Sequence, residues 1–254
     1  MAFRLDVYAK TRMGILVAFL VVNLVFGLFA QAIFQGNLLF KIAYKVFLIL
    51  CLVGLLRELR IPMFRMNGKL WMGAGCFFAL LVLFVVQETE YATSPAWASD
   101  EHGYFFLSCL LVGLFEELLF RVFVFDSVFK AVGAIRNRLL IAVVCTALIF
   151  GVAHFSNLFH ADTNPLAIVN QALFAFSIGI LLQYILIRTQ QLPVVVSIHA
   201  GINYLGAFQR ELLETVTPKD MYTLQDFWVS SLLCLCLFMV IIIPISRFLV
   251  DSRK

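Results

Sequence analysis

The sequence contains few charged residues for its length. Only 13% of its 254 residues are Asp, Glu, Lys or Arg, whereas 63% are hydrophobic, and the mean hydropathy is +0.98. A soluble domain carries about 25% charged residues, so this chain has too little charge to cover the surface of a water-soluble globule. Intrinsic disorder is also excluded, because disordered chains combine low hydrophobicity with high charge. The composition indicates an integral membrane protein.

The chain also lacks the patterns of several familiar proteins. Its six cysteines all lie in apolar stretches, and none belongs to a C-x-x-C pair. We therefore expect neither disulfides nor a structural zinc site. The motifs H-E-x-x-H of zinc proteases and G-x-S-x-G of serine hydrolases are absent. The net charge of +4 is modest and indicates no nucleic-acid partner.

Long apolar runs separated by charged residues predict about eight transmembrane helices, each of which needs about 20 residues. The expected fold class is all-α, a polytopic membrane protein with a single integral membrane domain over residues 1–254 and a motif-bearing core at about 104–209. The expected spans are approximately Met13–Phe34, Ile42–Leu56, Leu70–Val86, Tyr104–Phe125, Leu139–Phe155, Leu166–Ile187, Pro193–Phe208 and Phe227–Ser246.

Basic residues in the connecting segments predict the orientation. They gather at the N-terminus, after the second, fourth and sixth expected spans, and at the C-terminus. In contrast, the segment Gln87–Gly103 carries four acidic residues and neither Lys nor Arg. Cytoplasmic loops of membrane proteins are enriched in Lys and Arg, so we expect both termini to be cytoplasmic. The lack of N-x-S/T sites favours a prokaryotic inner membrane.

A second interpretation of the N-terminus stays open. Basic residues, an apolar run and Ala30-Gln31-Ala32 resemble a cleavable signal peptide. The run of about 22 residues is long for a signal peptide and matches the length of a transmembrane helix. We therefore favour a retained span.

Three ionisable residues lie within the fourth expected span. An ionisable side chain at the centre of such a helix costs roughly 2.5–3.5 kcal/mol on insertion scales. Glu117 and Arg121 are four residues apart, so they share a helix face and are expected to form an ion pair. Glu116 is rotated by about 100° from Glu117. It therefore has to take up a proton or find a partner on another helix.

Candidate partners for Glu116 lie in two other spans. His154 is near the end of the fifth span, and His199 and Asn203 share one face of the seventh. A carboxylate and an imidazole that converge on water make a general base, and an imidazole with an amide makes a donor pair for an oxyanion. Polar contacts that only hold helices together, at about 1 kcal/mol each, explain a carboxylate with two imidazoles less well.

Other chemistries remain open for these residues. Glu116 with His154 and His199 would supply the ligands of a His₂Glu zinc site. Cys109, seven residues before Glu116, offers a nucleophile on nearly the same face, although a lone membrane cysteine is usually an apolar filler. A chain of Glu and His also serves proton-coupled transporters, but no inverted repeat with broken helices is visible.

Three motifs resemble those of the CPBP (or Abi) family, the CAAX prenyl proteases and bacteriocin-processing enzymes. Glu116 to Arg121 resembles E-E-x-x-x-R, Phe150 to His154 resembles F-x-x-x-H, and His199 to Asn203 resembles H-x-x-x-N. The motifs occur in the family's order, each in its own expected span, and the resemblance covers about residues 115–204. Val122 departs from the family, since many members have Gly directly after the Arg.

The resemblance implies a glutamate-type intramembrane protease that needs no metal or other cofactor. Glu116 and His154 would activate the attacking water, His199 and Asn203 would hold the oxyanion, and Glu117, Arg121 and Phe150 would support the site. The implied partners are the lipid bilayer and a membrane-embedded or lipid-anchored substrate, prenylated or not. A non-catalytic immunity or scaffold protein of the same fold is the alternative.

The expected spans place these residues at different depths in the membrane. At ~1.5 Å per residue, Glu116 and His199 lie about 10–15 Å from the cytoplasmic ends of their spans, and His154 lies about 22 Å from its own. If His154 reaches Glu116, the fifth span is tilted, starts deeper or breaks, or the expected boundaries are wrong.

Overall fold

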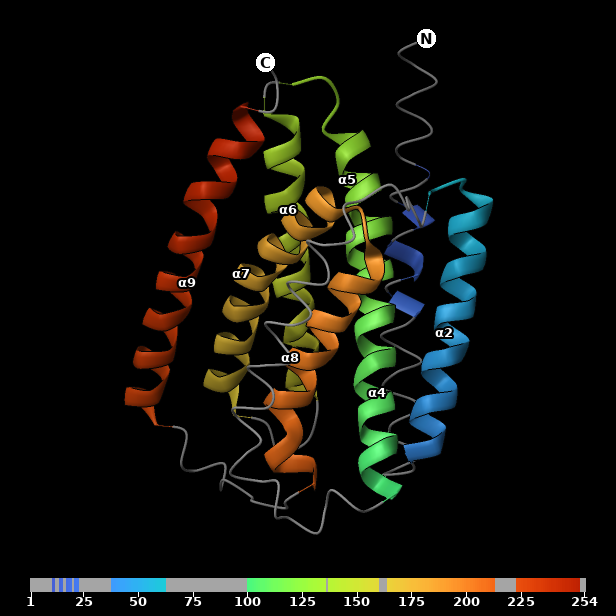
Figure 1. Cartoon of the computed structure of the whole chain (residues 1–254), viewed down its shortest axis with the longest axis vertical. Coiled ribbons are helices and arrows are strands. Elements are labelled where there is room, and N and C mark those ends of the chain that lie inside the picture. The colour runs from blue at the N-terminus through green and yellow to red at the C-terminus, as the bar shows by residue number, and fades with distance from the viewer. Residues whose placement is uncertain are drawn as a thin grey trace. The chain divides into compact units, whose positions relative to one another are not determined.

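The computed structural model is helical in the part of the chain that it describes (Figure 1). That part comprises residues 11, 14, 15, 17–19, 21, 22, 38–62, 100–135, 137–159, 164–212 and 223–251. It contains no strand, which confirms the all-α class. The first expected span, with Ala30-Gln31-Ala32, lies largely outside these residues, and the third lies wholly outside them.

The six remaining expected spans are all helical. The fourth differs most, because the chain stays helical from Asp100 to Ala131 through three successive elements. The elements are α2 (Leu38–Glu58), α4 (Asp100–Glu116), the π-helix η2 (Glu117–Val124), α5 (Phe125–Ala131), α6 (Arg138–Ala153), the 3₁₀-helix η3 (His154–Phe159), α7 (Pro165–Thr189), α8 (Leu192–Leu212) and α9 (Leu224–Asp251).

Two stretches among the described residues are long and apolar enough to cross a membrane. They are Arg138–Phe159 and Pro165–Thr189, and two shorter apolar helices are Leu192–Tyr204 and Leu224–Val240. The count of eight spans and the cytoplasmic position of both termini stay predictions.

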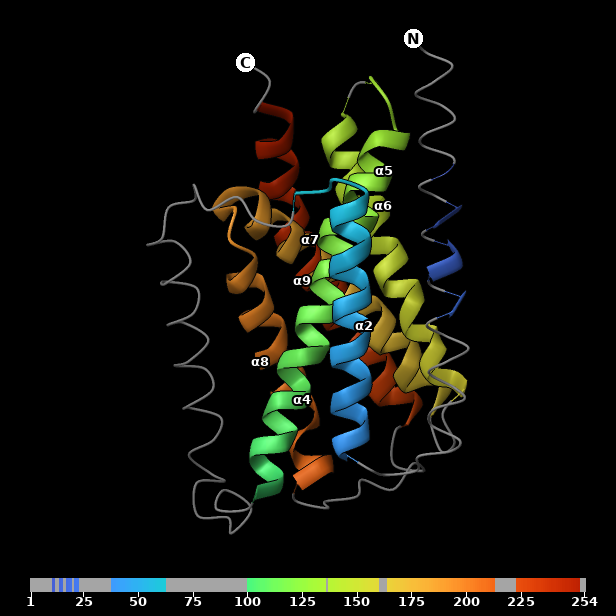
Figure 2. The ribbon, with the colours of Figure 1, turned by 90° about the vertical axis from the view of Figure 1, so that its right-hand side faces the viewer.

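The chain divides into two compact units, which are described separately. One unit contains residues 31–119 and 185–217, and within it α4 packs against both α2 and α8. Figure 2 shows α2 alongside α4. Gly113 permits the close approach of α4 and α8, since a Cβ there would lie 3.1 Å from the Ala200 nitrogen and 3.2 Å from the Val196 oxygen.

The other unit contains residues 1–30, 120–184 and 218–254. The turn between α5 and α6 includes two residues with positive φ, Gly133 and Asn137. Arg138 Nε then donates to the Phe129 carbonyl at 2.7 Å, with its guanidinium over the Phe129 ring. These contacts hold α5 against the start of α6.

The helices α7 and α9 of the same unit are joined by polar side chains. Ser231 donates to Asn170 Oδ1 at 2.7 Å, and Asn170 Nδ2 donates to the Phe227 carbonyl at 3.3 Å. Such bonds across apolar helices contribute about 1 kcal/mol each. Asn170 is therefore a packing residue in this structure.

We expect Gly113→Ala to destabilise the contact between α4 and α8. The added methyl group would meet backbone atoms, which cannot rotate away as a side chain can. Overpacking of this kind costs about 1–3 kcal/mol, so the melting temperature in detergent should fall by roughly 3–10 °C. Gly103→Ala is the matched control on the same helix, because nothing lies within 4 Å of its Cβ position. Equal melting temperatures for the two variants would contradict the close approach.

Candidate active site

The two glutamates of the first motif lie at the junction of two kinds of helix. Glu116 is the last residue of α4, and Glu117 is the first residue of η2. π-Helical turns are rare and occur frequently at functional sites. Because the π-helix closes i→i+5 hydrogen bonds, residues four apart do not stack as they do in an α-helix. The α-helical geometry assumed for Glu117 and Arg121 is therefore wrong here, and their ion pair stays a prediction.

His199 of α8 bridges the two glutamates. Its Nδ1 lies 2.7 Å from Glu117 Oε1, and its Nε2 lies 3.3 Å from Glu116 Oε2. Glu117 is fully buried and His199 is 4% exposed. The side chain of Glu116 keeps 23% of its exposure. Of the three, Glu116 is thus the group that an outside molecule can reach.

The cluster of Glu116, Glu117 and His199 has to share protons. A neutral imidazole offers one donor and one acceptor, whereas an ionised carboxylate only accepts. Two arrangements satisfy both contacts: an imidazolium between two carboxylates, or a neutral imidazole that donates to one carboxylate and accepts from the protonated other. Both hold the same number of protons and carry a net charge of −1. Transfer of one proton between His199 and a glutamate interconverts them.

The structure brings these residues together in a different grouping from the predicted one. His199 and Asn203 were expected to act as a pair, and they do lie one turn apart on α8. Asn203 is half-buried. The contact of His199 with Glu116 was one of the candidates that the sequence offered. The contact of His199 with Glu117, however, was not predicted, because helix periodicity says nothing about which faces of separate helices meet.

His154 is held in one tautomer by its own helix. It caps the C-terminus of α6, and its Nδ1 lies 2.8 Å from the Phe150 carbonyl oxygen. A carbonyl oxygen only accepts, so Nδ1 carries the hydrogen. The neutral ring then presents an unprotonated Nε2, which is a base and a hydrogen-bond acceptor.

Phe150 links His154 to Arg121. The Phe150 and His154 rings meet edge to face at 4.8 Å, and the Arg121 guanidinium lies 4.5 Å from the centroid of the Phe150 ring. Both Arg121 and Phe150 are buried. A guanidinium over an aromatic face gains electrostatic stabilisation that grows when water is excluded. Phe150 therefore packs against the imidazole of His154, and Arg121 packs against the Phe150 ring.

The helices on either side of the turn at residues 132–137 bear on the difference in expected depth. Glu116 precedes the end of α5 at Ala131 by 15 residues, and His154 follows the start of α6 at Arg138 by 16. By residue count, each is therefore about equally far along the chain from the turn that joins the two helical segments. The helix continues past Phe125, the expected end of the fourth span. His154 belongs to the other compact unit, so its meeting with Glu116 stays a prediction.

Lys45 is a charged residue that the predicted site does not include. It lies in α2, inside the expected span Ile42–Leu56, and its Nζ is 5.0 Å from the centroid of the Phe115 ring. The signal was present in the sequence, because the cost of an ionisable group in a membrane helix applies to Lys45 as it does to Glu116.

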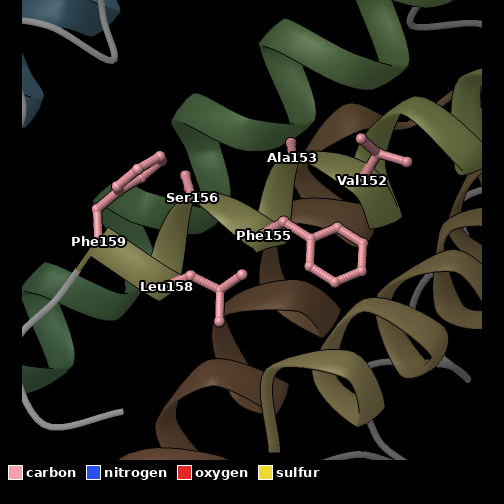
Figure 3. A pocket seen from close by; sticks show the side chains of 6 residues that line it. All are labelled: Val152, Ala153, Phe155, Ser156, Leu158 and Phe159. Carbon is pink, nitrogen blue, oxygen red and sulfur yellow. The ribbon is translucent and has the colours of Figure 1, made fainter. Parts of the chain in front are cut away.

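An open apolar hollow of about 440 Å³ is lined by residues that flank His154 in the sequence (Figure 3). Ala153 and Phe155, the neighbours of His154, both line it, and Ser156 is the one hydroxyl-bearing residue in the lining. A surface of this kind accepts an apolar group. The lining residues are Val152, Ala153, Phe155, Ser156, Leu158 and Phe159.

Residues 98–205 match the family model of type II CAAX prenyl endopeptidases, Rce1-like. We call residues 98–205 the Rce1-like segment. The match confirms the resemblance to CAAX prenyl proteases that the three motifs indicate. The family is one of membrane-embedded proteases, and it implies a lipidated or membrane-associated protein substrate. No curated protein and no solved structure is matched by the chain.

The Rce1-like segment contains every residue that the sequence predicts for the site. It covers less than half of the chain and excludes α2, hence Lys45. Within the described ranges, no group of three or more His, Cys, Asp or Glu side chains is arranged to hold a metal ion.

We expect the neutral form of the His154 imidazole to carry its hydrogen on Nδ1. The reason is the 2.8 Å contact of Nδ1 with the Phe150 carbonyl. Nitrogen NMR of protein labelled at histidine, with the signals of His154 identified by their loss in His154→Gln, would show a protonated Nδ1 and a bare Nε2. A bare Nδ1 would contradict the assignment of Nε2 as the base.

Proposed function

We propose that the chain is an intramembrane endopeptidase that hydrolyses a peptide bond in a membrane-embedded or lipid-anchored protein. The observation that carries the proposal is the cluster of Glu116, Glu117 and His199, a partly accessible carboxylate tied to a buried imidazole inside the Rce1-like segment. An ordinary packing contact does not require three titratable groups that share protons. A hydrolase requires such groups to take up a proton and return it.

Glu116 acts as the general base in this proposal. Its carboxylate removes a proton from water, and the resulting hydroxide attacks the carbonyl carbon of the substrate. His154 Nε2, as an acceptor, orients the same water molecule. The equal positions of Glu116 and His154 along their helices, counted from the turn at residues 132–137, support this role. Protonated Glu116 then returns its proton to the leaving nitrogen when the C–N bond breaks.

His199 and Asn203 stabilise the oxyanion. Glu117 holds the His199 ring through Nδ1, in the way that a buried carboxylate orients the imidazole of a catalytic triad. The 3.3 Å distance from Nε2 to Glu116 is longer than a good hydrogen bond. The N–H on Nε2 is therefore available to an oxyanion bound beside Glu116, and the Asn203 amide one turn away supplies the second donor.

Glu116→Gln should abolish cleavage while the protein still inserts and folds. The amide cannot accept a proton, and losing a general base reduces the rate by about 10²–10⁴-fold. We would compare the N-terminal peptides of membrane proteins from cells that make the wild type or the variant at matched levels. Substrates should accumulate uncut only in the variant.

Glu58→Gln is the matched control for this experiment. It is the same substitution at an exposed residue at the end of α2, so it should process substrates normally. Unchanged processing by Glu116→Gln would refute the mechanism and favour the non-catalytic scaffold of the same fold.

Proton transport is a second candidate function, favoured by the proton sharing of His199 with two glutamates. A relay needs groups that exchange a proton without a large change in charge, and this cluster has them. Proton flux through purified protein in liposomes that stops in His199→Gln would support transport. A protease without flux would exclude it.

A further inference from the structure

The 3₁₀-helix η3 carries His154 at its first position and has little support of its own. It runs for six residues, His154–Phe159, and none of its side chains is buried. Runs of 3₁₀-helix longer than three or four residues are uncommon, because their hydrogen-bond geometry is poorer than that of an α-helix. The conformation of this segment therefore depends on its contacts with other elements.

A pair of side-chain amides ties η3 to α7 within one compact unit. Asn157 Nδ2 donates to Gln171 Oε1 at 2.9 Å. Both residues lie in the stretches that are long and apolar enough to cross a membrane, where an amide is costly unless it is hydrogen-bonded. Asn157 is half-buried and Gln171 is exposed. The pair thus attaches one helix to the other without filling the core between them.

His154 lies midway between two attachments of its segment to α7. Three residues before it, Gly151 permits a close approach, since a Cβ there would lie 2.8 Å from the Ala172 carbonyl oxygen. Three residues after it, Asn157 bonds to Gln171, the neighbour of Ala172. The i→i+3 pattern of a 3₁₀-helix also pairs the Asn157 N–H with the His154 carbonyl. The turn that carries the imidazole is therefore attached on both sides to adjacent residues of α7.

We propose that Asn157 and Gln171 are positioning residues, whose hydrogen bond holds the His154 imidazole in the orientation that the attacking water requires. Both act through His154, and both lie outside the three motifs. Their part in cleavage rests on the proposed protease function, whereas their hold on the imidazole does not.

The first test separates kcat from KM, with a substrate that the Glu116→Gln comparison identifies. Gln171→Met keeps the length of the side chain and removes the acceptor, so kcat should fall about 10-fold while KM changes less than about twofold. Asn157→Leu removes the donor and should cause the same loss. The double variant should be no slower than either single variant, because each alone breaks the bond. Unchanged kcat in both single variants, or losses that multiply in the double variant, would overturn the proposal.

Asn170→Leu is the matched control on the same helix. Asn170 precedes Gln171, but its hydrogen bonds run to Ser231 and the Phe227 carbonyl of α9. Its loss should lower the melting temperature and leave kcat unchanged. An equal fall of kcat in Asn170→Leu would show that loosening α7 anywhere slows the enzyme, which would overturn a specific role for the amide pair.

The second test needs no enzymatic activity. In nitrogen NMR of protein labelled at histidine, the His154 ring signals should shift or broaden in Gln171→Met and Asn157→Leu and stay in place in Asn170→Leu. Either amide variant is sufficient if the other fails to fold. Unchanged His154 signals would overturn the proposal. Shifted signals in the variants, together with a wild type that cleaves no substrate, would instead refute the protease and leave the hold on the imidazole intact.

Discussion

The hydrogen bond between His199 and Glu117 is the constraint on which the rest of the site depends. It joins α8 to the start of the π-helix at 2.7 Å, and both side chains are buried. A charge or an imidazole in an apolar interior is tolerated only when it is hydrogen-bonded. The bond also requires that α8 lies close to α4, which Gly113 permits because a Cβ would meet the backbone of Val196 and Ala200. Gly113, three residues before Glu116, therefore permits the helix packing that the bond between His199 and Glu117 requires.

The π-helix gives the two adjacent glutamates different environments. Glu116 ends a regular α-helix and stays partly exposed, whereas Glu117 opens the π-helix and is completely buried. One carboxylate can then meet water while its neighbour orients an imidazole. Two carboxylates in the same environment would compete for the same partner and repel each other. In the proposed mechanism, the irregular backbone thus separates a reacting role for Glu116 from an orienting role for Glu117.

Much of the site could be predicted from the sequence, because ionisable residues in apolar spans are few and expensive. That reasoning found Glu116, Glu117, Arg121, His154 and His199, and the order of their motifs indicated the resemblance that the match of residues 98–205 confirms. The π-helix could not be predicted, since no residue type marks it. The contact of His199 with Glu117 could not either, because it depends on the angle between helices. The cost of an ionisable residue in an apolar span also singles out Lys45, which lies inside the expected span Ile42–Leu56.

Charge balance explains how such a site persists among apolar helices. Two glutamates and a histidine with shared protons leave one negative charge, and water cannot screen it there as it does at a surface. Moving one proton between His199 and either glutamate leaves that net charge unchanged, so the two proton arrangements interconvert without bringing a new charge into the apolar interior. In the proposed mechanism, this suits a carboxylate that has to gain and lose a proton in each turnover.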